Sequence, residues 1–134
     1  MTSKPLVEVA LRLAGQGFSP DDVTALVGLS PTKTWRCGDS IQGTWLQRKN
    51  DGWSFGLLQR ETYEMDAFLR ELLDAIEPYK AKIVEAAERF HLDVEVSFGV
   101  YVRDETPASW FAAETIRRLA SIGASLDVDM ILSE

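Results

Sequence analysis

Three segments of the chain alternate between apolar residues and residues that are mostly polar or small, and this pattern constrains the fold most. They run from Val7 to Leu13, from Val94 to Val100 and from Leu126 to Leu132. Because successive side chains of a strand point to opposite faces of a sheet, each segment predicts a strand with one buried face. Asp127 and Asp129 occupy polar positions of the third segment, which indicates an edge strand or one face in water.

Helical patterns fill the stretches between these strands. Ser19-Pro20-Asp21-Asp22 is a helix-start signal with the serine as the expected cap, and Gly28 is expected to end this short helix. The longest periodic segment runs from 63 to 90. Pro78 inside it predicts a break or kink, because proline lacks an amide donor and clashes with the preceding turn. A last helix is expected over 116–122.

The region from 29 to 58 is less regular. Asn50-Asp51-Gly52 is a turn signal, and it favours a hairpin in which 44–48 pairs with 53–58. The resulting order is strand, helix, hairpin, long helical segment, strand, helix, strand. This order matches a ferredoxin-like split unit (β-α-β-β-α-β) with an added carboxy-terminal helix and strand. We therefore expect a single α+β domain over 1–134, with helices on one face of one mostly antiparallel sheet.

Charge and composition argue against several classes of partner. The chain has 14 Lys and Arg against 21 Asp and Glu, a formal net charge of −7. Nucleic acid and anionic membranes are therefore not expected as partners, because both need clustered basic residues. No apolar run approaches the roughly 20 residues that span a bilayer, and the first five residues lack the layout of a signal peptide. Cys37 is the only cysteine, so no internal disulfide is possible, and a reduced, cytoplasmic location is expected.

The residue types that commonly carry catalysis or bind metals do not form a recognisable set. Arg36 lies beside Cys37 and could favour a reactive thiolate, but the base would have to be His91, the only histidine. A structural role at a helix end is the commoner explanation for that histidine. One cysteine and one histidine cannot form a structural zinc site. We predict no catalytic residue, no metal and no cofactor, and we favour a non-enzymatic function.

The segment 29–39 is the strongest candidate for a binding site. It places Trp35 and Arg36 in a loop that ends in Gly-Asp, and these two residue types anchor protein interfaces most often. We predict Trp35, Arg36, Asp39 and Trp53 as binding residues. In the alternative, Trp35 and Trp53 plug the end of the sheet, because tryptophan is commonly mostly buried. Arg36 would then pair with Asp39.

Four pieces of the chain follow one another in a distinctive order. They are Phe18 to Leu29 leading into Pro31-Thr32, a short basic stretch reaching Gly38-Asp39, Trp53 after a turn, and Ala113 to Gly123 ahead of the Leu126-Asp127-Val128-Asp129 strand. In this order and spacing the chain resembles a bacterial group catalogued as domain-of-unknown-function family 4279. The resemblance covers nearly the whole chain. It implies no reaction, so no residue inherits a catalytic role from it.

Two classes of function stay open. The first is a protein-binding module of immunity-like or regulatory type, favoured by the missing catalytic set, the acidic charge and the Trp35–Arg36 loop. The alternative is a small-molecule-binding sensor or a small enzyme that uses a pocket near Arg36 and Asp39. Self-association is a further possibility, because an edge strand over 126–132 could extend the sheet into a homodimer.

Overall fold

Two long strands form the centre of the sheet. The structure is a computed structural model that describes residues 3–132. In it, β1 (Leu6–Gly15) pairs antiparallel with β5 (Asp93–Val102), with Val9 opposite Phe98. The apolar residues of both strands lie on one face, where they are buried: Val7, Val9, Leu11 and Leu13 from β1, and Val94, Val96, Phe98 and Val100 from β5. The alternating patterns of these two segments are thus confirmed as strands with one buried face.

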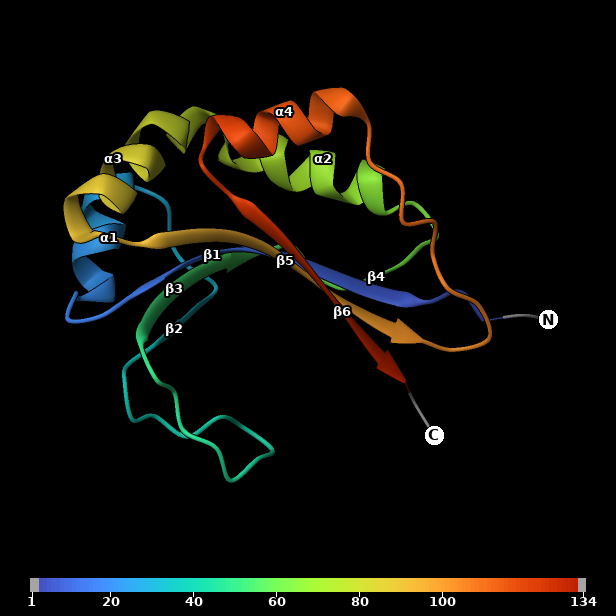
Figure 1. The fold of residues 1–134 in the computed structure, drawn as a ribbon, viewed down its shortest axis with the longest axis horizontal. Coiled ribbons are helices and arrows are strands. Elements are labelled where there is room, and N and C mark those ends of the chain that lie inside the picture. The colour runs from blue at the N-terminus through green and yellow to red at the C-terminus, as the bar shows by residue number, and fades with distance from the viewer. Residues whose placement is uncertain (1–2, 133–134) are drawn as a thin grey trace.

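The remaining strands extend the sheet in both directions (Figure 1), in the order β2-β3-β1-β5-β6. β3 (Asp51–Gly56) pairs antiparallel with β1, and β2 (Lys33–Trp35) pairs antiparallel with β3. The short β4 (Arg60–Glu61) pairs with the start of β1. β6 (Ser125–Leu132) pairs parallel with β5, so it forms the edge of the sheet opposite β2. A mixed α+β fold with an open, mostly antiparallel sheet is confirmed, whereas the match to a ferredoxin-like split unit stays a prediction.

The helices lie along one side of the sheet (Figure 1), and they cover its apolar face. They are α1 (Pro20–Val27), α2 (Met65–Ile76), the 3₁₀ turn η1 (Glu77–Tyr79), α3 (Lys80–Phe90) and α4 (Ala113–Ser121). The break expected at Pro78 is confirmed, because that residue lies in the 3₁₀ turn between α2 and α3. Gly28 ends α1 with a positive φ of 80°, a conformation that glycine adopts without a Cβ penalty. Ser19 precedes α1 as expected, but its side chain makes no capping hydrogen bond.

The expected hairpin between 44–48 and 53–58 is wrong. Asn50-Asp51-Gly52 does not form its turn, because Asp51 and Gly52 already belong to β3. The partner of β3 is β2, with Trp35 opposite Gly52, and the whole of 36–50 is inserted between the two strands. A turn signal depends on local backbone preference, whereas here the side chains of Asp51 and Trp35 make tertiary contacts that hold this segment extended.

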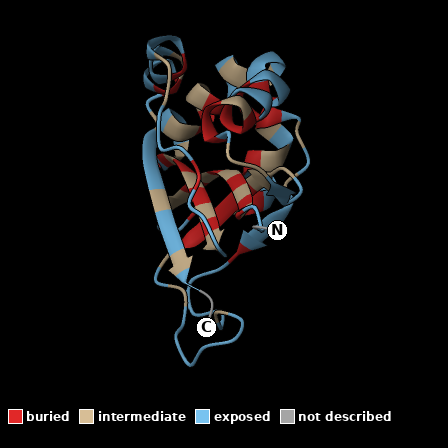
Figure 2. Ribbon diagram, turned by 90° about the vertical axis from the view of Figure 1, so that its right-hand side faces the viewer, coloured by how far each residue is buried: buried red, intermediate tan, exposed pale blue. Residues whose placement is uncertain are grey.

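The two faces of the sheet differ in character. Figure 2 shows buried residues concentrated in the central strands and on the inner sides of the helices. Trp53 is part of this core: it is fully buried on the helix-covered face, and its indole N–H donates to Thr24 Oγ1 at 3.0 Å. The opposite face, which we call the open face, is covered by no helix within residues 3–132, and it presents small and charged residues such as Ala10, Arg12 and Ser97.

One buried hydroxyl in α4 is unsatisfied. Thr115 is fully buried, and its Oγ1 has no hydrogen-bond partner among the described residues. Thr115→Val replaces the hydroxyl with a methyl group of similar size, so we expect the free energy of unfolding to rise by about 1 kcal/mol. Urea denaturation followed by circular dichroism measures this change. Thr115→Ser is the matched control, which keeps the hydroxyl, loses the methyl group and should be destabilised. A destabilised valine variant would show that the hydroxyl is hydrogen-bonded in solution.

Candidate functional site

Residues 36–50, which we call the arm, connect β2 to β3 and project beyond the sheet (Figure 1). The arm is folded back on itself by backbone hydrogen bonds, from Gly38 N to Arg48 O at 2.9 Å, from Arg48 N to Asp39 O at 2.7 Å and from Ile41 N to Leu46 O at 2.9 Å. Because these bonds join its two sides, the arm is an ordered projection with a defined tip.

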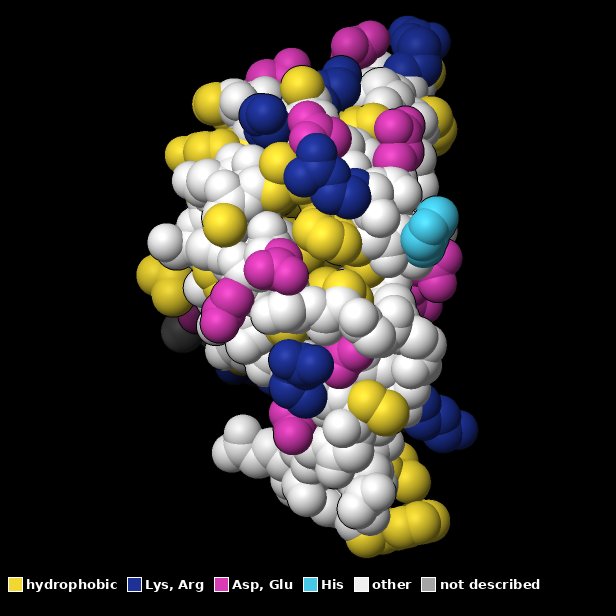
Figure 3. Space-filling model, turned by 90° about the vertical axis from the view of Figure 1, so that its left-hand side faces the viewer, with side chains coloured by type: hydrophobic (Ala, Val, Ile, Leu, Met, Phe, Trp, Pro, Cys, Tyr) yellow, Lys and Arg dark blue, Asp and Glu magenta, His cyan; other side chains and the backbone are white. Residues whose placement is uncertain are grey.

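The tip of the arm carries exposed apolar side chains. Trp45 is 91% exposed and Leu46 is 46% exposed. The turn beneath them is held by Thr44, whose hydroxyl donates to Ile41 O at 2.9 Å and accepts the Leu46 N–H at 3.1 Å. Figure 3 shows hydrophobic side chains at this free end of the molecule. A tryptophan so exposed adds nothing to the core, and its surface is available to a partner.

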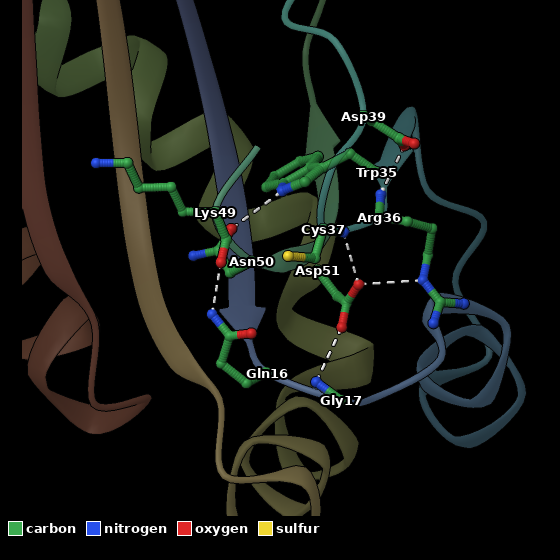
Figure 4. Close-up of polar contacts among 9 residues, drawn as sticks. All are labelled: Gln16, Gly17, Trp35, Arg36, Cys37, Asp39, Lys49, Asn50 and Asp51. Carbon is green, nitrogen blue, oxygen red and sulfur yellow. Dashed lines mark hydrogen bonds and ion pairs between the residues drawn. The ribbon is translucent and has the colours of Figure 1, made fainter. Parts of the chain in front are cut away.

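The base of the arm is organised by the buried carboxylate of Asp51 (Figure 4), which is only 4% exposed. Asp51 Oδ1 accepts hydrogen bonds from Cys37 N at 2.9 Å and from Arg36 Nε at 3.1 Å, and Oδ2 accepts one from Gly17 N at 2.9 Å. These hydrogen bonds, above all the one from Cys37, lower the pKa of Asp51 below its ordinary value. An ionised Asp51, at the start of β3, therefore links the start of the arm to the segment that follows β1.

Trp35 holds the other side of the arm base. Its ring lies on the open face of the sheet over Gly52 and is only 5% exposed. The guanidinium groups of Arg48 and Arg12 lie 4.5 Å and 5.0 Å from its ring centre, distances typical of cation–π contacts. The indole N–H also donates to Asn50 Oδ1 at 3.3 Å (Figure 4). Trp35 therefore contacts the returning half of the arm and fixes it against the sheet.

The structure separates the four predicted binding residues. Trp53 lies in the core, while Trp35 lies on the opposite face of the sheet. Arg36 and Asp39 are exposed neighbours at the base of the arm, where Asp39 Oδ2 accepts the backbone N–H of Arg36 at 2.8 Å. The Arg36 side chain pairs with Asp51 instead of Asp39. A binding role for these four residues stays a prediction.

Sequence reasoning did not select Trp45 as a binding residue, although it is the most exposed tryptophan among the described residues. The expected hairpin placed it in a strand over 44–48, where a tryptophan would have a sheet face to cover, so the sequence carried no signal for its exposure. Asp51 was also missed, because its role depends on donors that are distant in sequence.

The side chains considered for catalysis and metal binding are not assembled into a site. Cys37 is exposed and free, and its backbone N–H bonds to Asp51. His91 lies at the carboxyl end of α3 in a left-handed conformation, with φ of 55°, and no hydrogen bond joins it to Cys37 within the described residues. Across 3–132, no group of three or more His, Cys, Asp or Glu side chains is arranged to hold a metal ion.

Two cavities are found among the described residues. One, of about 620 Å³, lies between the ends of α3 and α4 and the first residues of β5 and β6. The other, of about 470 Å³, lies on the open face of the sheet and is lined by residues that include Glu8, Arg12 and Asp127. Neither is lined by Arg36 or Asp39. A small-molecule pocket at those two residues stays a prediction.

Comparison with known protein families identifies the chain. A family described as a domain of unknown function, DUF4279, matches residues 5–133. The chain belongs to the DUF4279 family. The resemblance seen in the order of its sequence pieces is confirmed, while a bacterial origin and the domain limits of 1–134 stay predictions. Comparisons with curated proteins and with solved structures gave no match. The function of this DUF4279 member is therefore unknown.

The length and polarity of the helices decide whether one of them could span a membrane. Over 3–132, none of the helices is both long enough and apolar enough to cross a bilayer. A cytoplasmic location stays a prediction.

Proposed function

We propose that this DUF4279 domain is a non-enzymatic protein-binding module of immunity-like or regulatory type, and that the tip of the arm is its contact site. The observation that carries the proposal is the 91% exposure of Trp45 on an arm whose base is fixed by hydrogen bonds. Tryptophan is enriched among the residues that dominate interface energies. Its apolar surface faces water in the free protein, so burying it against a partner releases free energy.

The rigid base of the arm supports the same proposal. The side chain of Asp51 binds the outgoing half of the arm at Cys37. The side chain of Trp35 contacts the returning half at Arg48 and Asn50. Binding then orders fewer groups than it would with a flexible loop, and this lowers the entropic cost of association. The net charge of −7 favours a basic partner, because opposite charges speed the encounter. Arg36 and Asp39 would act in this role by positioning the arm.

We expect Trp45→Ala to abolish the recovery of a stoichiometric protein partner when the tagged chain is purified from its host. With the purified partner, isothermal titration calorimetry should show an affinity loss of about 2 kcal/mol or more, roughly 30-fold in Kd. Stability should stay within about 0.5 kcal/mol, because the side chain makes little contact with the fold.

Trp110→Ala is the matched control, since Trp110 is 65% exposed but lies in the segment before α4. It should leave the partner bound. Equal partner affinity for wild type and Trp45→Ala would refute the arm tip as the contact site.

A further inference from the structure

β6 is an edge strand whose outer side has no partner strand in the described part of the chain. One side of β6 pairs with β5, from Ser125 opposite Glu95 to Leu132 opposite Val102. Its other side faces away from the sheet, and Figure 2 shows most of the strand as exposed, with half-buried residues between. An open edge presents unpaired backbone N–H and C=O groups that can accept another strand.

The side chains of β6 divide by chemistry between the two faces of the sheet. On the helix side, Leu126 and Met130 are 37% and 42% exposed, although the facing positions of β5 are buried. On the open side, Asp127 and Asp129 lie beside Ser97 and Gly99, and neither carboxylate forms an ion pair within 3–132. The helix side of the edge is therefore apolar, whereas the other side carries two aspartates without an ion pair, followed by Ile131.

A second copy of the chain is a poor occupant of this edge. Two β6 strands related by a two-fold axis pair antiparallel, and directly opposite residues lie on the same face. Two such registers pair the largest number of β6 residues. If the two-fold axis passes at Val128, Asp127 of each copy lies opposite Asp129 of the other. If it passes at Asp129, the two copies of Asp129 lie opposite each other. Like charges directly opposite each other destabilise a sheet, so both registers are unfavourable.

We propose that β6 binds an extended segment of a partner protein, in which basic residues alternate with apolar ones, as an added strand of the sheet. Lysine or arginine side chains would lie opposite Asp127 and Asp129, and the alternate apolar side chains would cover Leu126, Val128 and Met130. This inference goes beyond the proposed function, because β6 and the arm lie at opposite edges of the sheet.

The test uses two capped eight-residue peptides, one alternating lysine with valine and the other glutamate with valine. Each is titrated into the ¹⁵N-labelled full chain. We expect the lysine peptide to shift the amide resonances of 125–132 and to bind at least tenfold more tightly than the glutamate peptide. Equal binding of both peptides, or shifts that fall outside β5 and β6, would overturn the proposal.

Charge reversal separates strand pairing from general attraction to an acidic protein. The double variant Asp127→Lys, Asp129→Lys should prefer the glutamate peptide. The control Asp21→Lys, Asp22→Lys changes the net charge equally in the first turn of α1, at two exposed residues, and should keep the preference for lysine. An unchanged lysine preference in the β6 variant would contradict the proposal, as would a peptide-free dimer through β6 in sedimentation velocity. Trp45→Ala should leave peptide binding to β6 unchanged. The proposal for the arm tip and the proposal for β6 can therefore be refuted separately.

Discussion

A single methyl group added at Gly52 is expected to destabilise the protein by about 2–3 kcal/mol. A Cβ atom at this position would lie 1.9 Å from Cε2 and Cζ2 of Trp35, far inside van der Waals contact. In Gly52→Ala the indole must therefore leave the surface of β3, and its contacts with Arg12 and Arg48 are lost with it. Chemical denaturation of the variant measures the loss.

A double-mutant cycle tests the cause of this loss. Trp35→Ala alone should cost about 3 kcal/mol, as truncation of a buried tryptophan commonly does. In that background Gly52→Ala should be neutral or slightly stabilising, because the clash is gone and glycine is unfavourable inside a strand. The expected coupling energy between the two positions is about 2 kcal/mol or more.

Gly56→Ala supplies the control within the same strand and on the same face. Its Cβ would approach Ala10 Cβ at 3.1 Å and does not meet Trp35. Its effect should be similar whether position 35 holds tryptophan or alanine. A Gly52→Ala variant as stable as wild type would mean that the indole does not cover Gly52 in solution.

Asp51→Asn is expected to lower the free energy of unfolding by about 2–3 kcal/mol at pH 7. The amide keeps the shape of the side chain, but it has one oxygen to accept hydrogen bonds where the carboxylate uses two. At least one backbone N–H at the base of the arm loses its acceptor, and Arg36 loses its ionic partner. Asp39→Asn is the matched control, with an expected change below about 0.5 kcal/mol, because Asp39 is exposed and its amide oxygen can still accept the Arg36 N–H.

The contribution of Asp51 should depend on pH in a defined direction. Its native pKa is lowered below the ordinary value near 4 for aspartate, chiefly by the hydrogen bond from Cys37. The unfolded chain therefore takes up a proton at Asp51 before the native protein does as the pH falls. The stability difference between wild type and Asp51→Asn should be full above about pH 5 and shrink toward the lowered native pKa. A difference that stays constant from pH 7 to pH 3 would contradict the ionised network.

The sequence by itself determined most of the secondary structure. The alternation in β1 and β5 and the helical periodicity of α2 and α3 extend over many residues, and each pattern reflects burial of one face. The alternation in β6 also predicted a strand correctly, but its apolar side chains are exposed or only half-buried at the edge of the sheet. Gly28 and Pro78 marked helix ends correctly because their backbone restrictions act within the residue itself or its neighbours. The aspartates of β6 indicated an edge strand or one face in water, and the structure places β6 at the edge of the sheet.

The sequence alone did not decide which strand pairs with β3, or what lies between the two strands. The Asn50-Asp51-Gly52 motif favours a turn locally, but Asp51 collects donors from Gly17, Arg36 and Cys37 only once the chain has folded. The sequence also did not predict how deeply each tryptophan is buried. Trp53 lies under the helices, Trp35 lies on Gly52 on the other face, and Trp45 stands in water at the tip of the arm. Residue type sets how much surface a side chain can bury, whereas the partners that bury it come from distant parts of the chain and are fixed only by the tertiary structure.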